Sequence, residues 1–138
     1  MPFSKDMKSL VRAAKSPDPG SYRPFLVGVS ILVVDEVDDI RVILAFFLET
    51  KGANVLLAEN ASRAIALALG ERPNLILMDM QLPDMDGYIV ARRLKNSGFL
   101  GPIISISGRT QSGERERCRR AGCVDLVPKP IDLIELRE

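Results

Sequence analysis

The sequence predicts an α/β fold: a doubly wound, five-stranded parallel sheet in the order 2-1-3-4-5, with helices on both faces. Short apolar runs bounded by turn-forming residues recur along the chain, and longer amphipathic stretches separate them. At 138 residues, 46% of them hydrophobic, the chain suffices for one domain with a substantial core. This alternation is typical of βαβ units, whose right-handed crossovers leave few topologies.

The predicted strands are apolar runs rich in Ile, Val and Leu, a composition typical of strands buried on both faces. They are residues 31–34, 54–58, 74–79, 103–106 and 124–127. The third run ends at Asp79, and a Pro, two further acids and a Gly follow it. In that loop we expect Asp84 to act as a turn or cap residue and Asp86 to cap the next helix.

The predicted helices follow the strands, at residues 40–51, 61–70, 87–96, 111–120 and from 131 to the last residue, 138. Asp38 or Asp39 is a candidate N-cap for the first helix, and Gly52 ends it. The fourth carries a run of Glu and Arg, which favours a solvated face.

The first predicted helix carries apolar residues on more than one side. We place five of them toward the core: Ile40, Ile43, Leu44, Phe47 and Leu48. Val42, Ala45 and Phe46 then face outward. Two interpretations stay open for these three, ordinary exposed apolar residues or a surface that contacts a partner.

Residues 1–28 are predicted as an N-terminal extension and linker, and residues 29–138 as the domain. A short amphipathic segment precedes the Pro-rich stretch SPDPGSYRP, so a loose tail and a docked helix are both open. The last helix is short, which fits a truncated chain, a chain that continues into an output module, or a domain whose N-terminal segment replaces the missing packing.

Composition excludes several function classes. The net charge of +1 favours neither nucleic acid nor an acidic membrane as a partner. The chain has no His and no P-loop, so its chemistry must use carboxylates, hydroxyls, Lys or Arg. No secretory signal and no membrane-spanning run is visible, so we expect a cytoplasmic protein. Cys118 and Cys123 favour two ordinary reduced thiols over a metal site or disulfide.

Chemically active residues stand where the predicted strands end. Asp35 and Glu36 follow the first strand, Asp79 ends the third, Ser107 follows the fourth and Lys129 follows the fifth. The carboxyl ends of parallel strands share one edge of the sheet, where open α/β sheets bind ligands. We therefore expect these five side chains to form one site.

The expected site suits phosphoryl transfer onto a carboxylate. Crowded carboxylates repel one another, and Mg²⁺ relieves that repulsion while leaving room for phosphate. The backbone carbonyl of Gln81 is a candidate further metal ligand. Lys129 supplies a positive charge for a phosphoryl oxygen, Ser107 supplies a hydroxyl donor, and Asp79 is the candidate nucleophile.

The sequence resembles the receiver domains of two-component response regulators and hybrid sensor kinases. The resemblance spans residues 31–131 and rests on four stretches in order, ILVVDEVDDIR, NLILMDMQLPDMDG, PIISISG and AGCVDLVPKPI. The last stretch, with the residues before it, looks most like receivers that are fused to or serve hybrid sensor kinases.

The resemblance implies a phosphorylation switch. Asp79 would accept a phosphoryl group from the phosphohistidine of a sensor histidine kinase or histidine phosphotransfer protein. Lys129, in a cis peptide with Pro130, would contact that group, and Ser107 would move toward it. Mg²⁺ would be held by Asp35, Glu36, Asp79 and the Gln81 carbonyl. Such a domain is not a turnover enzyme, and shows at most weak self-phosphorylation and self-dephosphorylation.

Two positions depart from the family pattern. Glu36 stands where a second Asp is usual, which predicts a shifted or weaker Mg²⁺ site. Leu126 stands where Tyr or Phe is usual, which puts the aromatic read-out in question. Both favour the alternative of a pseudo-receiver, an interaction module that is never phosphorylated. An aspartate-based phosphohydrolase is disfavoured because Val37 prevents a D-x-D pair at Asp35.

Overall fold

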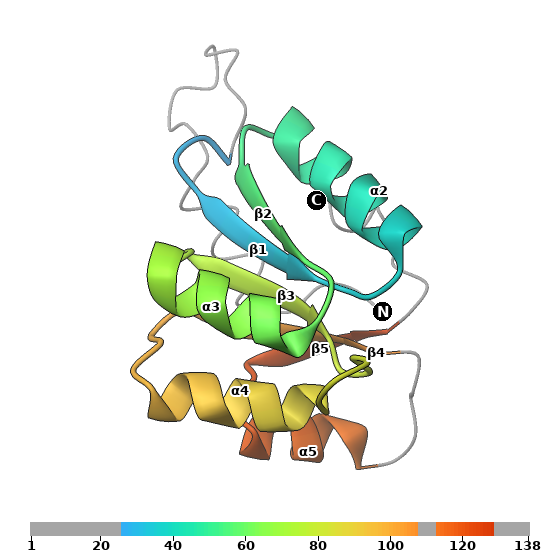
Figure 1. The fold of residues 1–138 in the computed structure, drawn as a ribbon, viewed down its shortest axis with the longest axis vertical. Helices are drawn as coiled ribbons and strands as arrows, with labels where there is room; N and C mark the ends of the chain where they lie inside the picture. Colours follow the sequence, from blue (N-terminus) through green and yellow to red (C-terminus); the bar gives the residue numbers. More distant parts are fainter. Residues whose placement is uncertain (1–25, 108–112, 129–138) are drawn as a thin grey trace.

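The computed structural model describes residues 26–107 and 113–128. The predictions for the N-terminal segment, for Lys129 and for the last helix lie outside the described residues. Labels follow Figure 1, in which the first described helix is α2.

The described residues form a five-stranded parallel sheet in the order β2-β1-β3-β4-β5, as the sequence predicts (Figure 1). The strands are β1 (Ser30–Val34), β2 (Asn54–Ala58), β3 (Leu75–Asp79), β4 (Ile103–Ser107) and β5 (Asp125–Pro128). Every residue of β3 and β4 is buried, which fits central strands covered on both faces.

Helices cover both faces of the sheet. They are α2 (Asp38–Thr50), α3 (Ala61–Glu71), α4 (Gly87–Asn96) and α5 (Glu114–Arg120). Alternate strand residues point to opposite faces, so α2 packs on one set and α3, α4 and α5 on the other (Figure 1). The first set is Ile31, Val33, Leu75, Leu77, Ile104 and Ile106; the second includes Leu32, Val34, Ile76, Met78 and Ile103.

Helix α2 corrects two predictions about its faces. Ala45 was expected outside but is only 7% exposed, and Ile43 was expected inside but is 53% exposed. The buried stripe is centred between Leu44 and Leu48. At 3.6 residues per turn, Ala45 lies nearer that centre than Ile43 does, and its small side chain fits against the sheet. Val42, at 61% exposed, faces outward as predicted.

The start of α2 also differs from the prediction. The helix begins at Asp38, and its N-cap is Val37, which makes no side-chain cap hydrogen bond. Asp38 and Asp39 therefore lie in the first turn, where their charges suit the helix dipole. The backbone N–H of Val37 donates to the Asp35 carboxylate at 2.9 Å, so a strand-end residue shapes the helix entry instead.

Candidate functional site

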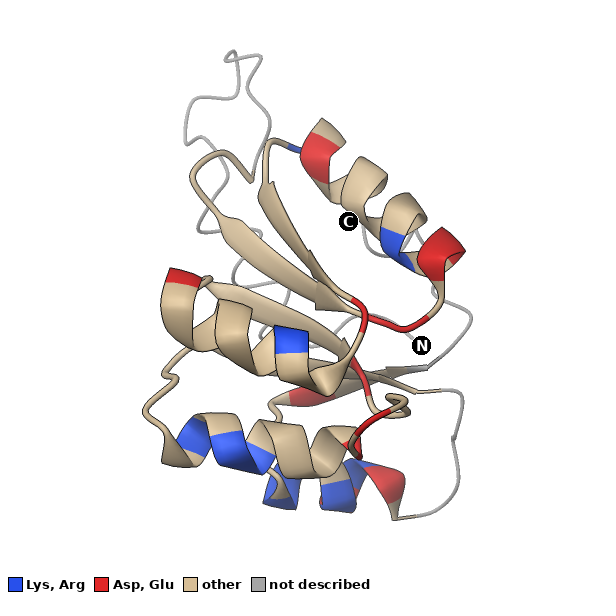
Figure 2. Ribbon diagram, in the orientation of Figure 1, with Lys and Arg blue, Asp and Glu red and all other residues tan. Residues whose placement is uncertain are grey.

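The carboxyl ends of β1, β3 and β4 bring three of the predicted residues to one edge of the sheet. Asp35 and Asp79 each lie one residue beyond the paired Val34 and Met78. Asp79 pairs in turn with Ile106 of β4, so Ser107 stands one step further on the neighbouring strand. Asp35, Asp79 and Ser107 are all at least 95% buried. In Figure 2, acidic residues mark the ends of β1 and β3, where the loops leave the sheet.

Asp35 makes hydrogen bonds through its backbone N–H, its carboxylate and its backbone carbonyl. Its own N–H donates to the carbonyl of Ala58 at 3.1 Å, which continues the pairing of β1 with β2. Its carboxylate accepts the Val37 N–H, and its carbonyl accepts a guanidinium N–H of Arg41 at 2.6 Å. Arg41 in turn pairs with the Asp38 carboxylate. These contacts tie the first turn of α2 to the end of β1.

Asp79 is oriented by the loop that follows it. Its Oδ1 accepts the backbone N–H of Gln81 at 3.0 Å, and the N–H of Met80 donates to the carbonyl of Ile106 at 3.2 Å. Gln81 also forms an antiparallel bridge with Asp86. The chain therefore folds back across the strand end and restricts the rotation of the Asp79 carboxylate.

Gly87 makes this folding back possible. Its N–H donates to the carbonyl of Met80 at 2.8 Å. A Cβ at this position would lie 2.6 Å from the Met80 Cα and 3.0 Å from the Asp79 carbonyl oxygen. The start of α4 can approach the end of β3 this closely only because residue 87 has no side chain.

Of the two other acids of the loop, Asp86 caps the helix that follows, as predicted, whereas Asp84 binds the start of a helix that precedes it. Asp86 accepts the N–H of Tyr88 at 2.8 Å and is the N-cap of α4. Asp84 reaches the neighbouring helix α3, where it accepts the N–H groups of Ala61 at 2.8 Å and Ser62 at 3.0 Å. The hydrogen bond from Ala61 holds the pKa of Asp84 below its ordinary value of 3.8. Neither acid is available to act with Asp79.

The described part of the site offers two buried carboxylates to a metal ion. Glu36 and Gln81 are exposed, and within residues 26–107 and 113–128 no group of three or more acidic or cysteine side chains is gathered to hold a metal. Mg²⁺ commonly needs only one or two carboxylates and keeps several waters. Asp35 and Asp79, adjacent at the strand ends, fit that requirement, while a contribution from Glu36 stays a prediction.

Leu126, which stands where the family usually has Tyr or Phe, is buried. It is 7% exposed and belongs to the core beneath α4 and α5. In the sheet it pairs with Ser105 of β4, two residues before Ser107. A side chain at this position therefore lies close to β4, the strand that ends at Ser107, and here it is an aliphatic core residue.

A link between α4 and α5 was not predicted from the sequence. The hydroxyl of Tyr88 donates to the Glu114 carboxylate, and the Arg117 guanidinium lies 4.2 Å from the centre of the Tyr88 ring. Burial, and then the Glu114 hydrogen bond, raise the pKa of Tyr88 well above its ordinary value. No local pattern pairs Tyr88 with Glu114, because strand β4 and its flanking loops lie between them in the sequence.

Comparisons with known proteins identify the family. The family model described as the response regulator receiver domain matches residues 31–138. The chain is 36% identical to response regulator MprA of Mycolicibacterium vanbaalenii over 108 residues, which cover 78% of this chain and 47% of that protein. It thus spans about half the length of that relative.

In two further comparisons, the match covers most of both chains. The chain is 32% identical to the polar-differentiation response regulator DivK of Brucella anthropi, covering 75% of this chain and 86% of DivK. A crystal structure of a two-component response regulator from Clostridium difficile superposes with a TM-score of 0.75 at 28% identity, covering 79% and 89% of the two chains.

Proposed function

Because this chain belongs to the family of response regulator receiver domains, we propose that it is a phosphoacceptor switch that receives a phosphoryl group on Asp79. The observation that carries the proposal is the position of Asp79. It is 4% exposed, stands at the carboxyl end of a central strand and lies beside the buried Asp35. Structural acids such as Asp84 instead bind backbone N–H groups at a helix start.

In the proposed reaction, a carboxylate oxygen of Asp79 attacks the phosphorus of a phosphohistidine. The phosphorus–nitrogen bond of the donor breaks and Asp79 becomes an acyl phosphate. The N–H of Gln81 fixes the orientation of the carboxylate, which reduces the entropic cost of the attack. The Ser107 hydroxyl and Lys129 are proposed to bind phosphoryl oxygens.

Mg²⁺ is the proposed cofactor, held by Asp35 and Asp79 with help from Glu36 and the Gln81 carbonyl. When bound, it would neutralise negative charge on the carboxylates and the phosphoryl group. The longer Glu36 side chain is proposed to weaken or shift the site.

The proposed phosphodonor is a sensor histidine kinase or a histidine phosphotransfer protein. It is proposed to contact the outer face of α2, where Val42, Ile43 and Phe46 are 61%, 53% and 70% exposed. These three side chains lie in the first three turns of α2, the helix that follows Asp35. An exposed apolar patch of this kind favours a protein contact. The setting is proposed to be cytoplasmic; no helix among the described residues is long and apolar enough to cross a membrane.

Phosphorylation is proposed to act as a charge change that shifts a two-state surface, not as a step of a turnover enzyme. The alternative, favoured by Glu36 and Leu126, is a pseudo-receiver that binds partners without being phosphorylated. One experiment separates the two.

The full chain is incubated with Mg²⁺ and a small acyl phosphate, and its intact mass is measured. The proposal expects one labile phosphoryl adduct that is lost in Asp79→Asn and kept in Asp84→Asn, a matched change at an exposed acid of the same loop. Absence of the adduct from the unmodified chain supports the pseudo-receiver. Steady release of phosphate from many substrates would support a hydrolase instead.

The metal site is tested in the same assay by varying Mg²⁺. Glu36→Asp is expected to reach half-maximal phosphorylation at a lower Mg²⁺ concentration than the unmodified chain. Identical Mg²⁺ dependence for the two proteins would show that Glu36 does not weaken the site.

A further inference from the structure

The end of α5 places two thiols side by side. The N–H of Gly122 donates to the carbonyl of Arg119 at 3.0 Å, and the N–H of Cys123 donates to the carbonyl of Cys118 at 3.1 Å. Gly122 has a φ of 100°, in the left-handed region. Together these features form a Schellman motif, which brings the side chains at the first and last positions into contact. In this chain both positions are cysteines.

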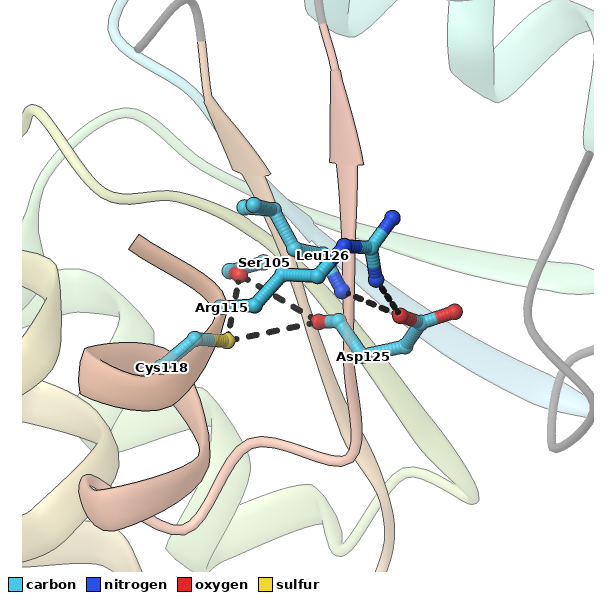
Figure 3. A network of polar contacts seen from close by, with 5 residues as sticks. All are labelled: Ser105, Arg115, Cys118, Asp125 and Leu126. Carbon is cyan, nitrogen blue, oxygen red and sulfur yellow. Dashed lines mark hydrogen bonds and ion pairs between the residues drawn. The ribbon is translucent and has the colours of Figure 1, made fainter. Parts of the chain in front are cut away.

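The thiol pair is buried between α5 and the edge of the sheet. Cys118 is 1% exposed and Cys123 is 3% exposed. The Cys118 sulfur lies 2.8 Å from the Ser105 hydroxyl oxygen and 3.4 Å from the Asp125 carbonyl oxygen (Figure 3). Arg115 binds the Asp125 carboxylate at 2.9 Å beside this network. The pair therefore contacts both β4 and β5.

The surroundings distinguish the two sulfurs chemically. A hydrogen bond from Cys123 lowers the pKa of Cys118, and the hydrogen bond with Ser105 adds to this effect. The same contact with Cys118, followed by burial, raises the pKa of Cys123. Cys118 is therefore the sulfur that ionises first, and the thiolate is the reactive form of cysteine.

A cavity leads to the pair. Its volume is about 450 Å³, and both cysteines line it. Its other walls include Arg115, Arg119, Asp125 and Leu126. This volume accommodates a small molecule. The two guanidinium groups pair with acids of the same wall, Arg115 with Asp125 and Arg119 with Glu116. Two adjacent thiols that share a cavity with basic side chains form an arrangement that neither cysteine would provide alone.

We propose that Cys118 and Cys123 are a redox-active dithiol that forms a reversible internal disulfide with a small disulfide, such as oxidised glutathione, as the oxidant. The Cys118 thiolate attacks one sulfur of the oxidant, forming a mixed disulfide and releasing one thiolate. Cys123 then loses its proton to solvent, attacks the Cys118 sulfur and releases the second thiolate. The protein loses two protons and two electrons, which the oxidant takes up as it becomes two thiols.

Oxidation removes the thiol that contacts Ser105. Ser105 lies in β4, two residues before Ser107, so the internal disulfide changes packing beneath the strand that carries the proposed phosphoryl-binding hydroxyl. The dithiol site does not depend on phosphoryl transfer, and its chemistry is measurable on a chain that was never phosphorylated.

The test incubates the folded full chain with oxidised glutathione and follows its intact mass and free-thiol content. The expected product has lost two hydrogens, retains no glutathione, remains monomeric and returns to the dithiol with excess reductant. Cys123→Ser is expected to stop at a stable glutathione adduct on Cys118. Cys118→Ser is expected to react at least about tenfold more slowly, because burial still raises the pKa of the Cys123 thiol that remains. Circular dichroism of both variants checks that they fold.

Several results would overturn the proposal. A folded chain that stays fully reduced, while the urea-unfolded chain forms the disulfide, would show that the pair is inert in the native state. Two retained glutathiones, or a disulfide between two chains, would show that the sulfurs do not bridge internally. Equal reaction rates in the two single variants would refute the assignment of Cys118 as the attacking sulfur.

Discussion

Gly87 supports a sharp prediction because its substitution has a calculable geometric conflict. In Gly87→Ala, the new Cβ would lie 2.6 Å from the Met80 Cα, whereas ordinary contacts begin near 3.4 Å. The start of α4 and the segment after Asp79 must therefore separate by about 0.8 Å, the difference between these two distances. Both partners are backbone atoms, so no flexible side chain can move aside.

The expected cost follows from core overpacking, which is typically about 1–3 kcal/mol. Removing a glycine also lowers the entropy of the unfolded chain, which offsets about 0.4–1 kcal/mol. The net loss should therefore be roughly 1–2 kcal/mol, and with a urea m-value of about 1–3 kcal/mol per molar the midpoint should fall by roughly 1 M. Urea unfolding followed by far-ultraviolet circular dichroism measures this shift.

Gly70→Ala is the matched control. It is the same substitution, within helix α3, and its added Cβ would meet nothing within 4 Å. We expect it to leave stability unchanged or raise it by up to about 1 kcal/mol. Should Gly87→Ala unfold at the same urea concentration as the unmodified chain, the close approach to Met80 would not constrain the fold and the reasoning would be wrong.

Two further predictions concern pH. Because the Tyr88 pKa is raised above 10.0, its contribution to stability is complete below that pH and lost only as pH rises through the raised value. Glu114→Gln should lower the ionisation midpoint of Tyr88, read from tyrosinate absorbance in a Tyr22→Phe background; an unchanged midpoint would contradict the hydrogen bond. The Asp84 pKa is depressed, so its contribution is complete above 3.8 and lost as pH falls through the depressed value. Asp84→Asn should therefore destabilise the protein to urea near neutral pH, with the difference vanishing in stronger acid; a constant difference would refute the charge effect.

Local patterns in the sequence determined most of the architecture. Apolar runs ending in turn residues predicted all five strands to within two residues at each end, because a strand buried on both faces must be continuously apolar. The same logic placed Asp79 and Asp35 at one edge of the sheet, since parallel strands share their carboxyl ends. Asp86 was predicted as an N-cap because capping is a property of a few consecutive residues.

The tertiary structure decided which side chains are buried and which meet, because these properties depend on the orientation and spacing of the helices and strands. Sequence periodicity identifies an apolar stripe on α2, but the packing of the helix on the sheet determined that Ala45 is buried and Ile43 exposed. Likewise, Asp84 binds the first turn of α3, whose first residue lies 23 residues earlier in the sequence. Cys118 and Cys123 appeared in the sequence as two ordinary thiols. Only the left-handed turn at Gly122 and the contact of α5 with β4 place them together, because side-chain proximity follows from backbone path and packing rather than from residue type.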